Sequence, residues 1–297
     1  MKTTIASLVL LHSFVSAFAQ STTASEGLLT RRYKEGELLT YHMKGANDNW
    51  RYEALAAGVV KKGSDGRFVE EYAWSGLMSN GAAVMLPPAS INFRQTVSLD
   101  PGIYPAAPDL SDVHPMLVGP ITDLLTFYVD FWLAARTGSL NHAGDHRFLP
   151  LGTPGSWADG IRVVLGQSSV DFDMTLGNID QSRGIIALTV RHVPPQQPQE
   201  QLPAAWMQKP VADTPNNWVQ VTKQEDRFQA AVGKETFEVH LDISLVNGEI
   251  LSGTMENVVD EQERDCQDEA LSHCGPPRNH PIRRHIELSL DRSTAKR

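Results

Sequence analysis

Cysteine, aromatic side chains and long apolar runs are scarce in this chain of 297 residues. Aromatic residues make up 7% of the sequence, and no apolar run reaches the roughly 20 residues that a helix needs to span a bilayer. The sequence also lacks the glycine-x-serine-x-glycine turn of serine hydrolases, a phosphate-binding glycine loop, a dinucleotide fingerprint and a zincin helix motif. We therefore assign no catalytic residue from a motif.

Positive charge is also in short supply. Lys and Arg number 26 against 35 Asp and Glu, which gives a formal net charge of −9. Proteins that bind nucleic acid or anionic lipid need clustered Lys and Arg to neutralise phosphates. We therefore expect no nucleic-acid partner and no adhesion to anionic membranes.

The N-terminus has the features of a secretory signal peptide. Lys2 supplies a positive charge, residues 5–18 form an apolar run, and Ala17-Phe18-Ala19 is a small-x-small cleavage pattern. An uncleaved membrane anchor is the alternative, but the run is too short to span a bilayer and is interrupted by His12. We expect removal of residues 1–19, export to the periplasm or the cell exterior, and no stable membrane insertion afterwards.

The two cysteines, Cys266 and Cys274, lie close together in the sequence. In an oxidising compartment such a pair predicts a disulfide that closes a short loop. The alternatives are a metal site with His273 or a redox couple. Metal sites favour closer cysteine spacing and more ligands, and redox couples favour two intervening residues. We therefore expect a structural disulfide.

Alternation of apolar and polar residues predicts a mainly β (α+β) fold, because this period of two is typical of strands. The predicted architecture is a curved antiparallel sheet or half-barrel meander in a single globular domain of residues 28–292. A flexible arm at 20–27 and a frayed tail at 293–297 are expected to flank it. The proline-rich stretch 101–120 is either a long loop or a domain seam. Strands are expected at residues 37–43, 52–61, 67–75, 91–99, 170–176, 186–192, 218–222, 227–232, 237–245 and 283–290.

Two hairpins can be aligned by the polarity of their facing residues. In the first, Phe172 is expected to face Val190, which matches polarity along both strands. The second turns at an Asn-Gly pair, which is a strong signal for a short turn. Leu245 is then expected to face Ile250, with a bulge near Gly253 that corrects the register farther from the turn.

One helix is predicted at residues 121–136, with Pro120 in its first turn and Gly138 just beyond its end. Apolar residues recur along it at helical spacing, and Asp123 and Asp130 are expected on the opposite, polar side. A helix this apolar must pack against another element. It either covers one face of the sheet or closes a cavity, and we expect the first.

The tract His142-Ala-Gly-Asp145-His146 places two imidazoles and a carboxylate within five residues. Zinc binds such nitrogen and oxygen atoms at about 2 Å, so His142, Asp145 and His146 are the candidate metal ligands, although no particular cofactor is predicted. The alternative is a solvated loop, because the tract follows the helix and contains glycine. His192 and His240 fall within predicted strands and are interpreted as packed or surface-paired.

Three features occur together in this chain: strands with alternating apolar residues, the hairpin of residues 239–254 with its Asn247-Gly248 turn, and a single apolar helix. This combination resembles the periplasmic lipoprotein-carrier half-barrel superfamily. The similarity covers roughly the second half of the chain, and the long loops at 101–120 and 194–206 depart from it. The resemblance implies a curved antiparallel sheet and covering helices around an apolar cavity for acyl chains. It transfers no individual binding residue.

Three functions are consistent with this sequence. The leading hypothesis is non-enzymatic binding or transport of an apolar or amphipathic ligand, such as a lipid, in a cavity. The second is a secreted metal-dependent hydrolase that uses the His142, Asp145 and His146 cluster. The third is a structural or envelope-interaction module. For the leading hypothesis the expected lining is aromatic and consists of Tyr72, Trp74, Phe127, Tyr128, Phe131 and Phe172.

Overall fold

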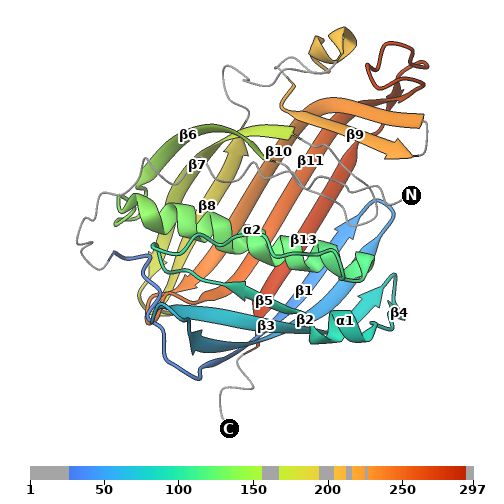
Figure 1. Ribbon diagram of the computed structural model, residues 1–297. Helices are drawn as coiled ribbons and strands as arrows, with labels where there is room; N and C mark the ends of the chain where they lie inside the picture. The colour runs from blue at the N-terminus through green and yellow to red at the C-terminus, as the bar shows by residue number, and fades with distance from the viewer. Residues whose placement is uncertain (1–26, 156–166, 194–203, 212–215, 225–226, 292–297) are drawn as a thin grey trace.

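The computed structural model describes residues 27–155, 167–193, 204–211, 216–224 and 227–291 (Figure 1). The signal peptide, nearly all of the N-terminal arm and the C-terminal tail lie outside these ranges. Those three expectations stay predictions.

A single antiparallel sheet of thirteen strands dominates the described chain, so the mainly β prediction is confirmed. The sheet is open, and its strands follow the order β4-β3-β2-β1-β13-β11-β10-β8-β7-β6, with β5, β9 and β12 paired beside this path. The strands are β1 (Leu38–Asn47), β2 (Arg51–Lys62), β3 (Phe68–Ser79), β4 (Ala82–Ala83), β5 (Arg94–Val97), β6 (His146–Gly155), β7 (Gln167–Asp180), β8 (Ile185–Val193), β9 (Trp218–Gln224), β10 (Arg227–Ser244), β11 (Ile250–Cys266), β12 (Arg278–Asn279) and β13 (Ile282–Leu290).

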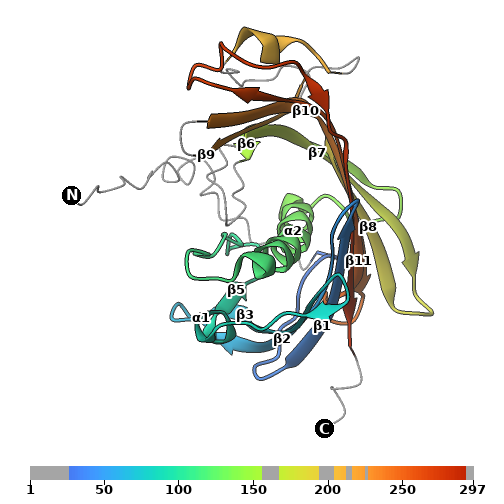
Figure 2. The same cartoon turned by 90° about the vertical axis from the view of Figure 1, so that its right-hand side faces the viewer.

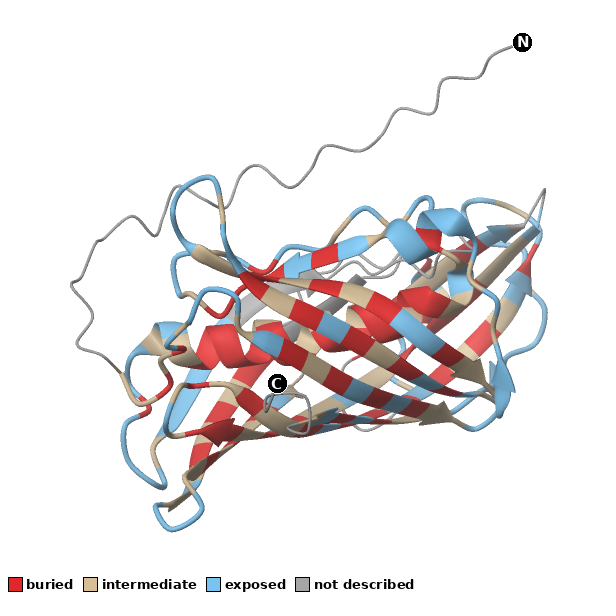
Figure 3. Ribbon diagram, turned by 90° about the horizontal axis from the view of Figure 1, so that it is seen from below, coloured by how far each residue is buried: buried red, intermediate tan, exposed pale blue. Residues whose placement is uncertain are grey.

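The sheet curves around α2 (Pro115–Thr137), which lies along its concave face (Figure 2). Buried residues alternate with more exposed ones along the strands (Figure 3). This alternation is expected where one face of a sheet packs on a helix and the other meets solvent. The concave face and α2 together form the main hydrophobic core. The predicted curved sheet with one covering helix is therefore confirmed.

α2 begins earlier than predicted. Its first residue is Pro115, and Nδ1 of His114 caps the helix by accepting a hydrogen bond from the Met116 amide (3.3 Å). Pro120, expected in the first turn, lies inside the helix. It removes a single backbone donor near the start, and packing of α2 against the sheet outweighs that loss. Gly138 ends the helix in the left-handed conformation (φ 62°), as predicted.

The stretch expected as one strand at 91–99 divides into the end of α1 (Pro88–Asn92) and the short strand β5. The chain between β5 and α2 then covers the outer side of α2, where Nε1 of Trp132 donates to the carbonyl of Asp100 (3.1 Å). By length and composition, α2 is the one described helix that could cross a membrane, but 61% of its apolar window is buried inside the protein. α2 is thus a core helix, enclosed between the sheet and this loop.

The hairpin of β7 and β8 forms with a different register from the predicted one. Phe172 faces His192 rather than Val190. The pairing shifts between Leu176 and Ile179, where a bulge changes the register close to the turn. A displacement of two residues leaves each side chain on its predicted face.

The hairpin of β10 and β11 also differs near its turn. Ile250 faces Ile243 rather than Leu245, because the connection is longer than the two-residue turn expected from the Asn-Gly pair. A register shift does occur between Asp242 and Ile243, close to the bulge predicted near Gly253.

A second, smaller core lies on the opposite side of the long strands from α2. Val232 is five residues from Phe237 on β10 and therefore points to the other face. It packs with Met207 of the short helix η2 (Ala205–Gln208) and with Cys266 and Leu271. Both faces of this part of the sheet are thus covered.

Candidate functional site

The six aromatic residues predicted to line a cavity lie between α2 and the sheet. Tyr72 and Trp74 come from β3 and Phe172 from β7, and the other three come from α2. All six are buried, and four of them, Tyr72, Phe127, Tyr128 and Phe131, are 0% exposed. A side chain that lined a water-sized cavity would expose surface to it. These four therefore contribute to close packing of the core.

Two of these aromatic residues surround a buried carboxylate. Tyr72 donates to Oε2 of Glu70 (2.8 Å), and Tyr128 donates to the same oxygen. Arg31 supplies a positive charge through Nε at 3.2 Å from Oε1 of Glu70. Burial, followed by the charge of Glu70, raises the pKa of both tyrosine hydroxyls well above the usual value. The tyrosines stay neutral and act as donors that satisfy Glu70.

The predicted metal ligands separate into two groups. The Asp145 carboxylate accepts hydrogen bonds from the backbone amides of Asn141 (2.7 Å) and His142 (2.8 Å), and these bonds lower its pKa. The exposed His142 ring lies 3.4 Å from the same carboxylate. His146 starts β6, and its ring pairs with Asp173 of β7. The structure brings His142 and Asp145 together and directs His146 elsewhere, which gives the metal prediction no support.

A row of paired residues crosses five strands on the concave face. Phe172 of β7 pairs with His192 of β8, which pairs with Phe237 of β10. Phe237 pairs with Asn257 of β11, and Asn257 pairs with Arg284 of β13. Directly paired residues share a face of a sheet. The row therefore places an imidazole and a guanidinium on the side that faces α2.

α2 supplies a carboxylate to each of these cations. His192 Nε2 lies 2.9 Å from Oδ1 of Asp130, and Arg284 donates to Oδ1 of Asp123 (2.7 Å). The second oxygen of Asp123 accepts a hydrogen bond from the Tyr52 hydroxyl (2.7 Å). Asp123 and Asp130 are seven residues apart and so lie on the same side of the helix. The expectation that they form an outward polar side is wrong, because both are buried against charged partners of the sheet.

Glu235 completes the group from β10, two residues before Phe237 and on the same face. Its Oε1 accepts a hydrogen bond from Nδ2 of Asn257 (2.7 Å). Burial raises the pKa of Glu235, although Asn257 and the nearby His192 and Arg284 oppose the shift. We refer to the whole set as the polar cluster: Asp123, Asp130, His192, Glu235, Asn257 and Arg284.

Electrostatics favour the charged forms of the two basic side chains in the polar cluster. Burial lowers the pKa of His192, but the charge and hydrogen bond of Asp130 outweigh it, so the pKa is raised overall. The charge of Asp123 raises the pKa of Arg284. The side chains of His192 and Arg284 remain 17% and 30% exposed, whereas their aspartates are almost fully buried. The cations thus present accessible surface with anions behind them.

Aromatic rings flank the imidazole. The His192 ring stacks on Phe237 and meets the edge of Phe172, each at 4.6 Å between centroids. These contacts fix the ring plane while Asp130 fixes Nε2. The interpretation of His192 as a packed or surface-paired histidine agrees with these contacts, but it named no neighbour and missed the cluster around it.

An apolar hollow opens at the edge of the sheet formed by β3, β4 and α1. Its volume is about 390 Å³. Trp74 is the one residue of the predicted aromatic set that lines it, and the other apolar lining residues are Leu77, Met78, Ala83, Val84, Leu86 and Ile91.

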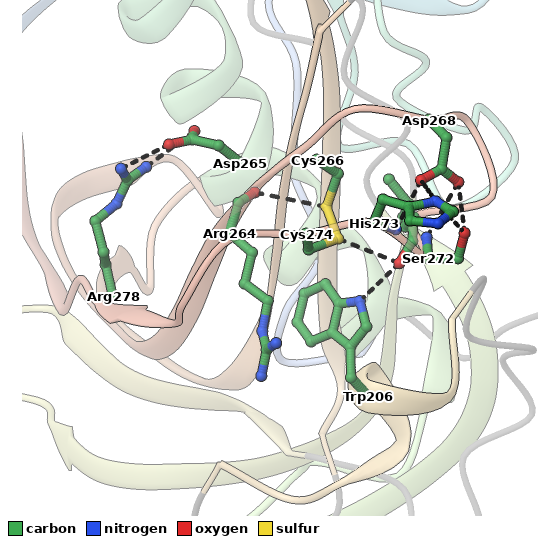
Figure 4. Close-up of a disulfide and its surroundings, with 10 residues drawn as sticks. Trp206, Arg264, Asp265, Cys266, Asp268, Ser272, His273, Cys274 and Arg278 are labelled. Atoms are coloured by element: carbon green, nitrogen blue, oxygen red, sulfur yellow. Dashed lines mark hydrogen bonds and ion pairs between the residues drawn. A yellow bond between two sulfur atoms is a disulfide. The ribbon is translucent and has the colours of Figure 1, made fainter.

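The predicted disulfide between Cys266 and Cys274 is present (Figure 4). Nε1 of Trp206 donates to the carbonyl of Leu271 within the closed loop (3.1 Å), and the Arg264 guanidinium lies over the Trp206 ring. The cysteines therefore belong to the smaller core, and the bond agrees with an oxidising compartment.

Among the described residues, one group has the composition and spacing of a metal site. It consists of Glu261, Glu263 and His280, whose ligand atoms all lie within 4.8 Å of one another. The only sequence signal is the alternation Glu261-Gln262-Glu263, which places both carboxylates on one face of a strand. Nothing in the sequence locates His280 beside them.

Comparison with known proteins identifies no relative: no protein-family model, no curated protein and no solved structure matches the chain. The resemblance to the lipoprotein-carrier half-barrels therefore stays a prediction. Function has to be argued from the chemistry of the site.

Proposed function

We propose that the protein is a non-enzymatic binder of an amphipathic small molecule, held on the concave face of the sheet with its polar group against His192 and Arg284. The observation that carries this proposal is the partial exposure of these two cations on a face that is largely apolar. Buried ion pairs contribute little to stability relative to apolar packing, because desolvation offsets their attraction. A fold that retains two such pairs under one helix is consistent with a binding role.

The composition of the polar cluster favours an uncharged polar group on the ligand. Each cation already has a carboxylate of its own, so an anionic group would gain little from either. Asn257 and Glu235 add hydrogen-bonding groups. Phe172 and Phe237 beside the imidazole offer apolar contact for the remainder of the molecule.

Export is part of this proposal. The disulfide supports an oxidising compartment, and the leader-like residues 1–19 support secretion with cleavage to the periplasm or the cell exterior. We propose that the protein takes up a lipid-like ligand outside the cytoplasm. The acidic chain fits a protein with no nucleic-acid partner and no stable membrane insertion. The similarity to the half-barrel carriers supports the same class of ligand.

Fluorescence of N-phenyl-1-naphthylamine, a neutral apolar probe, tests the proposal on purified protein. We expect saturable binding that dodecanol displaces more strongly than dodecyl sulfate. Phe237→Ala should weaken probe binding about tenfold or more, since a buried aromatic contact contributes roughly 1.5–3 kcal/mol.

Phe148→Ala is the matched control. Phe148 is exposed on β6 and pairs with Asp173, the neighbour of Phe172 that points to the opposite face. Thermal unfolding of both variants checks that they are folded. Equal probe affinity in the two variants, or stronger displacement by dodecyl sulfate, would contradict the proposed site.

A further inference from the structure

Two carboxylates and an imidazole meet near the end of β11. Glu261 and Glu263 lie two and four residues beyond Val259, on the face of the strand that also carries Asn257. β12 pairs with this part of β11, and the amide of His280 donates to the carbonyl of Glu261 (3.1 Å). The backbone thus holds the imidazole beside both carboxylates.

The two oxygens of Glu263 have different surroundings. Oε1 accepts hydrogen bonds from Arg278 (2.6 Å) and from Gln229. Oε2 lies 3.7 Å from Nδ1 of His280, which is too long for a hydrogen bond. Two ligands of one zinc ion, each about 2.0–2.2 Å from the metal, lie roughly 3.3–4 Å apart. The separation of Oε2 and Nδ1 therefore suits two ligands of a single ion.

Glu261 provides an independent indication of a ligand. The residue is 6% exposed, and its Oε2 atom is buried with no hydrogen-bond partner among the described residues. Leaving a buried polar atom unsatisfied is costly, and such atoms in native proteins require an explanation such as a bound ion or water. The Glu261 carboxylate is also one of the three groups whose candidate ligand atoms lie within 4.8 Å of one another.

We propose that Glu261, Glu263 and His280 bind one divalent cation, each through a single atom. A mixture of carboxylate and imidazole ligands suits Zn²⁺ or Mn²⁺. The exposed His280 ring leaves one side of the site open for entry of the ion and for water ligands. The positive charge of Arg278 repels a cation bound at Glu263. Asp265 offsets this charge, because both of its carboxylate oxygens accept hydrogen bonds from the Arg278 guanidinium (Figure 4).

The disulfide helps to position this site. Cys274 is followed by Gly275, whose amide donates to the carbonyl of Asp265 (2.9 Å), and then by two prolines that lead directly into β12. The chain between Cys274 and Arg278 therefore has little conformational freedom. Closure of the Cys266–Cys274 loop fixes where β12, and hence His280, meets β11.

Isothermal titration of the chelator-treated full chain with ZnCl₂ and MnCl₂ tests the proposal. We expect one ion per chain for at least one metal, and at least a tenfold loss of affinity in Glu261→Gln and in His280→Ala. His273→Ala is the matched control, because this exposed histidine pairs only with neighbours of the disulfide loop and lies outside the ligand group. It should bind as the native chain does.

Thermal unfolding provides a second readout. A bound ion should raise the Tm of the native chain and of His273→Ala, but not that of His280→Ala. Because the His280 side chain is exposed, its replacement should leave the fold intact. Absence of saturable binding, or binding by Glu261→Gln and His280→Ala equal to that of the native chain, would overturn the proposal. Neither readout depends on the naphthylamine probe. Failure of the metal site can therefore be distinguished from failure of the proposed binding of an amphipathic ligand.

Discussion

His192 Nε2 lies 2.9 Å from Oδ1 of Asp130, which joins β8 to α2 across the main core. Removal of one partner of a buried ion pair leaves the other without compensation and costs about 3–5 kcal/mol in a fully buried site. His192 retains some exposure and can lose its proton, so we expect Asp130→Asn to lower the free energy of unfolding by about 2–3 kcal/mol. Urea denaturation at neutral pH measures this. No change would show that the pair is unimportant for stability.

The same pair predicts how stability depends on pH. The pKa of His192 is raised in the folded chain, so its contribution is complete below the unfolded histidine pKa of about 6.5 and is lost as pH rises through the folded value. We expect the stability difference between the native chain and His192→Gln to shrink as the pH rises above about 6.5. Phe148→Ala, an exposed substitution that removes no titratable group, is the control and should show no such trend. A stability difference that grows with pH would contradict a raised pKa of His192 in the folded chain.

Tyr52 and Arg284 share Asp123, so the hydroxyl of Tyr52 can be tested alone. Tyr52→Phe removes one hydrogen bond to a buried carboxylate and should cost about 1.5–3 kcal/mol in the free energy of unfolding. Tyr104→Phe, at an exposed tyrosine, should change it by less than about 0.5 kcal/mol. Similar values for the two variants in urea denaturation would argue against the bond.

The Cys266–Cys274 disulfide closes a short loop at the edge of the smaller core. In the chain-entropy description, its loss should lower the free energy of unfolding by about 2–3 kcal/mol. We expect the double variant Cys266→Ser, Cys274→Ser to show this decrease in urea. Dithiothreitol should reproduce it in the native chain and have no effect on the variant. If the double variant has the same free energy of unfolding as the native chain, packing in the smaller core is sufficient to stabilise the loop without the disulfide.

Gly253 of β11 lies against Phe127 of α2. A Cβ atom there would lie 2.8 Å from Cε1 of Phe127 and 2.9 Å from Cδ2 of Leu241. Gly253→Ala should therefore destabilise the protein by about 1–3 kcal/mol through overpacking. In Gly275→Ala the nearest atom is 3.7 Å away, at the Asp265 carbonyl, and calorimetry should show little change in Tm. Equal Tm values for the two variants would mean that α2 can move away from the sheet.

The strands were predictable because their side chains alternate, and this alternation records which face is buried. It fixes faces but not partners, which is why the β7–β8 register was two residues off while Phe172 remained on its predicted face. β6 was missed altogether. It is an edge strand that contains Pro150 and Pro154 and carries little alternation.

The polar cluster could not be predicted from local sequence. Asp130 is 62 positions from His192, and Asp123 is 161 positions from Arg284. On a helix with no known neighbours, an aspartate is expected to face water, because burial of an unpaired charge is costly. Only the sheet register reveals that each aspartate has a cation beneath it. The spacing of seven residues between them was the available signal that they share one side of the helix.

The position of β13 has a consequence for biosynthesis. This strand is the last one in the described chain, yet it lies between β1 and β11, and the path from the first strands of the sheet to the later ones passes through it. The sheet therefore cannot be completed while the ribosome still holds residues 282–290, and pairing between such distant segments is slow. If the chain is exported as proposed, this delay keeps it open during synthesis, so that translocation can precede folding.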